Sequence, residues 1–284
     1  MLRGPWPAKA LPIGVFVVIL AALYAGILRA LVLQWWDDAN YSHGFLVPLF
    51  SGFLVWQRRT ELKTLASDGA TVGLALILGG IGMLLVGDLA AENFLMRSSL
   101  IVVLAGLVLF HLGPRIFRAV LFPLAFLFFM VPVPGVVFYA VTFPLQQLAA
   151  ENAAWTLDLL GVPVLLDGNV IHLSQISLGV TEACSGIRSL ISLLAGAVAG
   201  ASLLLPSGWI MVAFVASAVP ITILANAARV VMTGLIGQWF GIEYATGFFH
   251  EFAGWAIYVS AAACLLGVYG LIRIGQKLAR RWRR

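Results

Sequence analysis

The chain has 284 residues, of which 62% are hydrophobic and only 10% are charged, and its mean hydropathy is +1.02. A soluble domain is closer to half apolar and a quarter charged, so this composition excludes an ordinary water-soluble fold. It indicates an all-α polytopic membrane protein. The net charge of +5 is weak evidence for a nucleic-acid partner, because excess Lys and Arg in a membrane protein usually report its orientation. We therefore expect the lipid bilayer as a partner and no nucleic acid.

Apolar runs of membrane-spanning character follow one another along the chain. Eight are predicted as spans, at about 11–33, 44–56, 71–90, 98–113, 117–133, 186–205, 209–236 and 254–273. The second and fifth of these runs are short. No small-residue cleavage site follows the first run, so we predict that it is retained rather than removed as a signal peptide.

Basic residues occupy alternate gaps between these runs. They gather in 57–63, in 113–118 and in the closing segment "RIGQKLARRWRR", whereas the gaps 34–44 and 87–93 are acidic and aromatic. By the positive-inside rule, both termini are predicted to be cytoplasmic and the number of crossings even.

One long connection, about 134–183, is expected to form a small cap on the outer side. Its first part reads as an amphipathic helix on the membrane surface, with large apolar residues on one face: Leu145, Leu148, Trp155 and Leu159. Asp167-Gly168-Asn169 then lies between two β-prone runs, a pattern that predicts a short hairpin. We expect a single transmembrane domain over residues 1–284, with no additional C-terminal soluble domain.

Reactive side chains are predicted to converge near the outer face of the bilayer. Cys184 lies at the start of the sixth run, and Arg188 follows one helical turn deeper. Asn226 and Arg229 lie in the outer half of the seventh run, and His250 at the outer start of the eighth. A thiol, two guanidinium groups and an imidazole from three helices would then meet at one depth.

These residue types suit acyl transfer. A thiol attacks carbonyl carbon as thiolate, and a histidine near neutrality can take its proton and return it to a leaving amine. Arginine can hold a developing oxyanion or a substrate carboxylate with its fixed donors. Gly186 is expected to leave room beside the sulfur for a substrate backbone.

Structural explanations compete with each of these assignments. A cysteine in a membrane helix is commonly a packing residue, and Cys264 is interpreted in that way because it lies well inside the eighth run. Arg188 and Arg229 could snorkel or pair with nearby glutamates. His43 and His172 share the outer side with His250, but no metal-binding spacing such as HxxH is present, so no metal or other cofactor is expected.

Four short motifs, in order, carry a resemblance to a known family. "YSHGFLVPL" (41–49), "ACSGIRS" (183–189), "NAAR" (226–229) and "FFHEFAGW" (248–255) resemble the exosortases, which are polytopic bacterial inner-membrane enzymes related to the archaeosortases. The resemblance extends from about 34 to 273.

The resemblance implies that Cys184, Arg229 and His250 are catalytic. We expect Arg188, Asn226 and His43 to support these catalytic residues. The implied reaction is cleavage of the C-terminal sorting signal of secreted proteins at the periplasmic face, through a thioester, with transfer to an unknown acyl acceptor. That signal, PEP-CTERM, consists of a Pro-Glu-Pro motif, a transmembrane helix and a basic end. The family also implies a link to exopolysaccharide loci.

Two other functions remain open from the residues. A non-enzymatic exopolysaccharide assembly or transport component would use Arg188 and Arg229 to bind an anionic sugar or lipid. A thiol redox carrier is weaker, because the chain has no CxxC pair. For the enzyme, the hairpin at Asp167-Gly168-Asn169 is further predicted to grip the Pro-Glu-Pro segment by strand addition.

Overall fold

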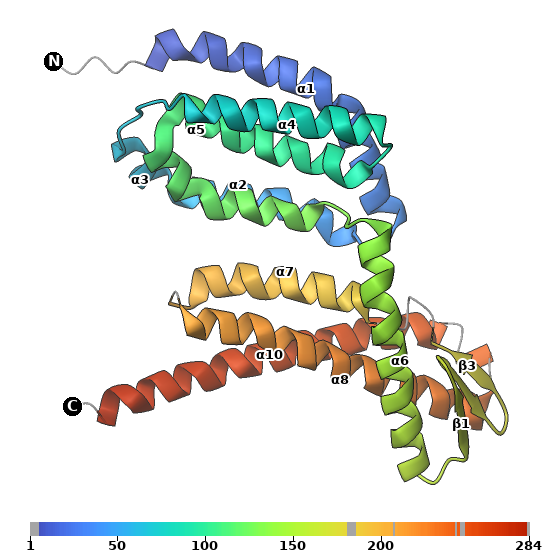
Figure 1. Cartoon of the computed structure of the whole chain (residues 1–284). Helices are drawn as coiled ribbons and strands as arrows, with labels where there is room; N and C mark the ends of the chain where they lie inside the picture. Colours follow the sequence, from blue (N-terminus) through green and yellow to red (C-terminus); the bar gives the residue numbers. More distant parts are fainter. Residues whose placement is uncertain (1–5, 181–185, 207, 242, 245–247, 283–284) are drawn as a thin grey trace. The chain divides into compact units, whose positions relative to one another are not determined.

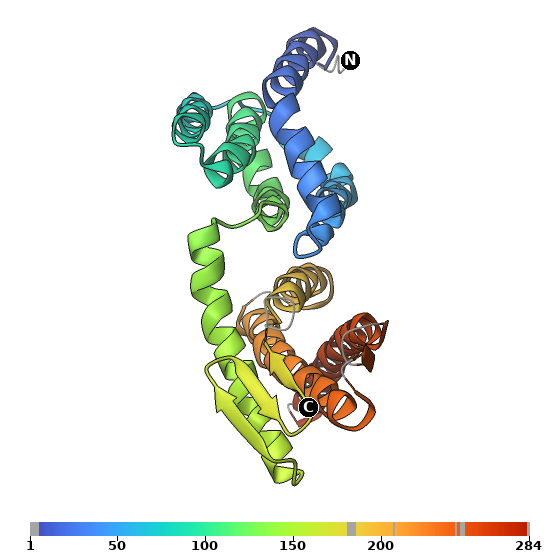
Figure 2. The same ribbon diagram turned by 90° about the vertical axis from the view of Figure 1, so that its right-hand side faces the viewer.

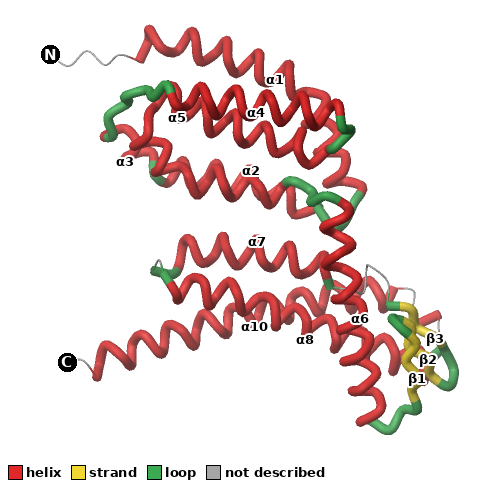
Figure 3. Tube along the Cα trace, in the orientation of Figure 1, coloured by secondary structure: helices red, strands yellow, loops and turns green. Residues whose placement is uncertain are grey.

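The computed structural model describes residues 6–180, 186–206, 208–241, 243–244 and 248–282; within these, the side chains of 6–17, 248–251 and 281–282 are left undescribed. The described chain is predominantly helical and contains one small sheet (Figures 1 and 3). It divides into two compact units, Met1–Pro134 and Gly135–Arg284. The all-α polytopic fold class predicted from the sequence is confirmed.

The first unit is built from helices alone in its described part. Its elements are α1 (Trp6–Asp37), η1 (Ser42–Phe45), α2 (Leu46–Gln57), α3 (Arg59–Thr64), α4 (Val72–Leu89), α5 (Asn93–Phe126) and η2 (Leu127–Met130). Both α5 and η2 belong to one long apolar stretch, Asn93–Met130.

Helix α5 folds back on itself at Gly113. Its backbone there is non-helical, with φ 86° and ψ 175°, and Pro114 begins the second half at a position where a missing N–H costs nothing. Arg97 Nη1 donates to Gln34 Oε1 at 2.6 Å, and the neighbouring Trp35 Nε1 donates to the Met130 carbonyl at 2.9 Å. A straight helix from residue 97 to 130 would be about 50 Å long, so both ends can reach adjacent α1 residues only because the chain reverses.

The two halves of α5 have different neighbours (Figure 1). The first half packs against α4, where glycines at seven-residue spacing, Gly73, Gly80 and Gly87, let the helices approach closely. The second half packs against α2, where Ser51 Oγ donates to the Pro123 carbonyl.

Six helices of the described chain are long and apolar enough to cross a membrane, so the predicted count of eight is wrong by this criterion. Two features account for the difference. Helix α2 has 12 residues, about 18 Å, against a hydrocarbon core of about 30 Å. The predicted runs 98–113 and 117–133 fall within one stretch, although the predicted break between them coincides with the bend at Gly113.

The second unit combines long helices with the sheet. Its elements are α6 (Gly135–Leu159), β1 (Val164–Asp167), β2 (Val170–Leu173), β3 (Ser177–Gly179), α7 (Ile187–Leu204), α8 (Trp209–Phe240) and α10 (Phe248–Trp282). The sheet lies along α6 in Figure 2.

The predicted hairpin is confirmed, and the chain adds a third strand to it. Asp167 pairs with Val170 across Gly168, whose φ of 59° suits the tight turn, and the antiparallel strand order is β1-β2-β3. The third strand, β3, was not predicted, because a strand of three residues is too short to show alternation.

The predicted helix of the cap is also present, as the second half of α6. Leu148, Trp155 and Leu159 are exposed along it, while small residues such as Ala150 and Ala153 are buried against the sheet and α8. The exposed apolar side fits the predicted position on the membrane surface, which stays a prediction.

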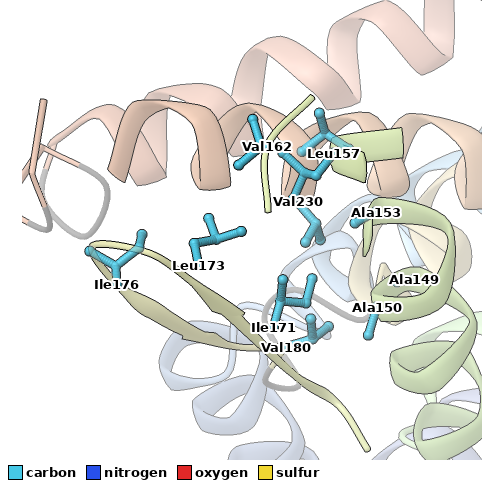
Figure 4. Packing of buried hydrophobic residues seen from close by; sticks show 11 residues of the cluster. Ala149, Ala150, Ala153, Leu157, Val162, Ile171, Leu173, Ile176, Val180 and Val230 are labelled. Carbon is cyan, nitrogen blue, oxygen red and sulfur yellow. The ribbon is translucent and has the colours of Figure 1, made fainter. Parts of the chain in front are cut away.

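Helix α8 joins two hydrophobic cores. Its first half packs with α7 and α10 through residues such as Phe214 and Ala218. Its second half packs, through Val230 and Val231, with α6 and the sheet, where Ile171 is fully buried (Figure 4). With 32 residues, α8 is about 48 Å long, which exceeds the thickness of a bilayer core. The helix therefore extends beyond the hydrocarbon, and the cap packs around its second half.

Candidate active site

The predicted nucleophile, Cys184, lies outside the described residues, and Gly186 is the first described residue after it. Gly186 has φ 78° and precedes the first residue of α7, Ile187. A left-handed backbone is costly for residues with a Cβ, so the local conformation requires glycine here. Gly186, two positions after Cys184, therefore fixes the backbone conformation at the start of α7.

Asn226 of α8 lies directly against that turn. The asparagine is 5% exposed, and a Cβ added to Gly186 would lie 3.0 Å from both Cβ and Cγ of Asn226. The expected role of Gly186, to make room for a substrate backbone, thus has a competing explanation in the structure. The missing side chain makes room for Asn226.

Arg229, three residues further along α8, lies against a different helix. A Cβ added to Gly254 of α10 would lie 3.3 Å from Arg229 Nη2 and 3.4 Å from its Cζ. The half-buried guanidinium therefore rests in a notch that glycine leaves in α10.

His250 belongs to the same helix as that notch. Its backbone is in α10, four residues before Gly254, a separation of about 6 Å or one turn. Its side chain is outside the described part. Asn226 and Arg229 therefore link, through α8, the helix that follows Cys184 and the helix that carries His250.

Two further supporting residues were predicted, and they lie in different units of the protein. Arg188 is exposed on α7. His43 belongs to the first unit, where its Nε2–H donates to the Phe129 carbonyl at 3.0 Å. Burial lowers the pKa of His43 from its usual value of 6.5, and the hydrogen bond to the Phe129 carbonyl opposes this, so the surroundings favour the neutral ring.

A further histidine lies on the sheet. His172 of β2 faces Ser177 of β3, and His172 Nδ1 and Ser177 Oγ are 2.8 Å apart. Among the described residues, no group of three or more His, Cys, Asp or Glu side chains could hold a metal ion.

Sequence reasoning missed Gly254, although a signal was present. The motif "FFHEFAGW" places a glycine one helical turn after its histidine, on the same face. That spacing shows that a neighbouring helix or side chain can come close beside the histidine, but the sequence does not say which one. The structure identifies it as Arg229.

These features define a multi-pass helical membrane protein in which three helices present polar residues and glycine notches to one another. A family model described as transmembrane exosortase matches residues 35–267, and the chain belongs to that family. Its general class is therefore that of a membrane transpeptidase or protease. No match was found among the curated proteins or the solved structures.

Proposed function

We propose that the protein is a cysteine endopeptidase and transpeptidase of the bacterial inner membrane that cleaves PEP-CTERM sorting signals at the periplasmic face. Cys184 is the nucleophile, His250 the general base and Arg229 the group that stabilises the oxyanion. One observation carries the proposal: α8 contacts Gly186, two residues after Cys184, through Asn226, and it contacts Gly254, four residues after His250, through Arg229.

The proposed reaction balances without a cofactor. The thiol gives its proton to His250, and the sulfur bonds to the substrate carbonyl carbon while Arg229 holds the oxyanion. The C–N bond then breaks, and the leaving amine takes the proton from His250. Water or an amine finally attacks the thioester, which releases the acyl group and regenerates the thiol.

Membrane confinement supports the choice of substrate. A tail with its own transmembrane helix shares the bilayer with the enzyme, and its Pro-Glu-Pro segment would lie at the depth predicted for Cys184. This replaces a three-dimensional search by a lateral one and aligns the scissile bond with the nucleophile.

The decisive experiment replaces Cys184. Cells carrying Cys184→Ala should accumulate unprocessed substrate, whereas Cys264→Ala should process it normally, because Cys264 is an exposed residue far along α10. The thioester should be trapped on Cys184 and released by hydroxylamine. Normal processing by the Cys184→Ala protein would refute the proposal.

Replacing Arg229 separates this proposal from a non-enzymatic role. Arg229→Lys keeps the charge but loses the planar donor fork, so cleavage should fall by about 10²–10³-fold. If polysaccharide production depended on Arg188 and Arg229 while Cys184→Ala had no effect, the assembly or transport function would be favoured instead.

The predicted orientation has its own test. A membrane-impermeant thiol reagent added outside the inner membrane should label Cys184, and Cys264→Ala protein should be labelled equally well. Labelling of Cys184 only after the membrane is opened would place the thiol on the cytoplasmic side and end the proposal.

A further inference from the structure

Strand β3 is an edge strand of the sheet in the described chain, and it is the strand nearest in sequence to the predicted nucleophile. The strand order is β1-β2-β3, and β3 ends at Gly179, five residues before Cys184. The other edge, β1, is further away in sequence. Of the two edges, β3 is the one closer in sequence to Cys184.

The hydrogen bonds of β3 fix which backbone groups point outward. The Val180 N–H donates to the Asn169 carbonyl at 2.8 Å, and the Leu173 N–H donates to the Ile176 carbonyl at 2.8 Å. In an antiparallel ladder, residues that exchange bonds with the partner alternate with residues whose N–H and C=O point away from it. Positions 176, 178 and 180 therefore bond towards β2, and the N–H and C=O of Ser177 and Gly179 point away from it, to a side where the described chain has no further strand.

The two residues whose backbone groups point outward are also accessible. Ser177 and Gly179 are both exposed, whereas Ile176 and Val180 are buried on the opposite face of the sheet. Unpaired backbone groups are too costly to face hydrocarbon, so this edge must face water or a partner. An edge with outward donors and acceptors at two positions is a template for one short extended peptide.

We infer that the outward edge of β3 binds the substrate as an added strand, and that a Pro-X-Pro sequence fits this edge because of its prolines. This inference rests on the proposed function, which supplies Pro-Glu-Pro as the sequence. Successive residues of a strand direct their N–H groups to opposite sides. When Glu faces β3, the two missing proline N–H groups lie on the far side, where no bond is needed.

The arrangement also positions the side chains of the bound segment. A residue opposite Ser177 or Gly179 places its side chain on the face that carries Ser177 and His172. The glutamate thus lies on the polar face, and both prolines lie on the face of Leu178, which packs against the hydrophobic core. The sequence predicted strand addition to the hairpin near Asp167-Gly168-Asn169, and this inference assigns it to the third strand, β3.

Binding can be measured apart from catalysis in full-length Cys184→Ala protein in nanodiscs. The probe is a synthetic peptide centred on Pro-Glu-Pro. Adding Gly179→Pro removes one outward N–H, so affinity should fall about tenfold. Adding Gly179→Ala keeps the N–H, and a Cβ there has nothing within 4 Å, so affinity should stay within about twofold.

The same variants test the direction of the N–H. Since that group points away from β2, Gly179→Pro should unfold at the same temperature as Gly179→Ala. A less stable Gly179→Pro protein would mean an inward N–H, and unchanged peptide affinity would mean that β3 is not the docking edge; either result overturns the inference.

A second probe leaves the protein unchanged. The same peptide with an N-methylated glutamate lacks the one donor that would face β3, and it should bind about tenfold more weakly. Equal binding of the two peptides also overturns the inference. Failure of the proposed function would appear differently, as substrate processing that continues without Cys184.

Discussion

Glycines are used for different purposes in the two units of this protein. In the first unit, Gly73, Gly80 and Gly87 of α4 face the backbone of α5: an added Cβ would come within 3.1 Å of a backbone atom at each position. In the second unit, Gly186 and Gly254 face the side chains of Asn226 and Arg229. Glycine permits two helices to pack closely in one case and accommodates a polar side chain in the other.

This difference predicts which substitutions unfold the protein and which inactivate it. A backbone cannot move aside without shifting a whole helix, whereas an arginine head group can turn about several bonds. Substitutions in α4 should therefore reduce stability, and those beside Asn226 and Arg229 should act mainly on the reaction.

The largest effect is expected for Gly73→Ala. The new Cβ would lie 2.6 Å from the Phe110 Cα and 2.7 Å from the Gly106 carbonyl oxygen, so α4 and α5 must separate. Overpacking of this kind costs about 3 kcal/mol. Thermal unfolding in detergent measures it, and Gly79→Ala, with nothing within 4 Å of its Cβ, is the matched control. Equal stability of the two variants would contradict the packing role.

Gly186→Ala should have the next largest effect. The alanine must adopt φ 78° and meet Asn226, and a left-handed alanine alone costs about 1–2 kcal/mol. We expect a moderate loss of stability together with a clear loss of substrate processing. The control is Gly196→Ala in the middle of α7, where nothing lies within 4 Å. Processing at the wild-type rate would show that the Gly186 turn does not position the nucleophile.

Gly254→Ala should change the reaction more than the fold. Its Cβ displaces the Arg229 guanidinium by a few tenths of an ångström, for which we expect about a tenfold fall in kcat, or about 1.4 kcal/mol. Gly267→Ala on the same helix, with nothing within 4 Å, is the control. In an Arg229→Ala background the Gly254→Ala effect should disappear; an undiminished effect would mean that the glycine does not act through Arg229.

The smallest effect concerns His43 in the first unit. Because burial lowers its pKa in the folded state, the unfolded chain takes up a proton first as the pH falls below about 6.5. The free energy of unfolding should therefore decrease from pH 7.5 to pH 5.5. His43→Gln should reduce that decrease, as measured by chemical denaturation at both pH values. An unchanged pH dependence would show that the ring is equally easily protonated when folded.

Most of the helical architecture was predictable because it depends on local properties. The lengths of the apolar runs predicted the long helices, the basic gap at 113–118 predicted the break in α5, and Asp167-Gly168-Asn169 predicted the β1–β2 turn. The site was predictable only as a set of residue types. The assignments of Cys184, Arg229 and His250 stay predictions, since the cysteine and the histidine side chain lie outside the described residues.

The sequence alone determined the composition, the membrane-spanning character of the helices and the order of the motifs, because apolar length and turn residues act within a few positions of the chain. Only the tertiary structure decided that the start of α5 and the end of η2 both meet α1, that Asn226 and Arg229 lie against different glycines, and that the outward groups of β3 pair with no other strand of the described chain. In helices that are apolar on all sides, periodicity does not mark the face that meets a neighbour. Close packing chooses that face, and it depends on residues far apart in the sequence.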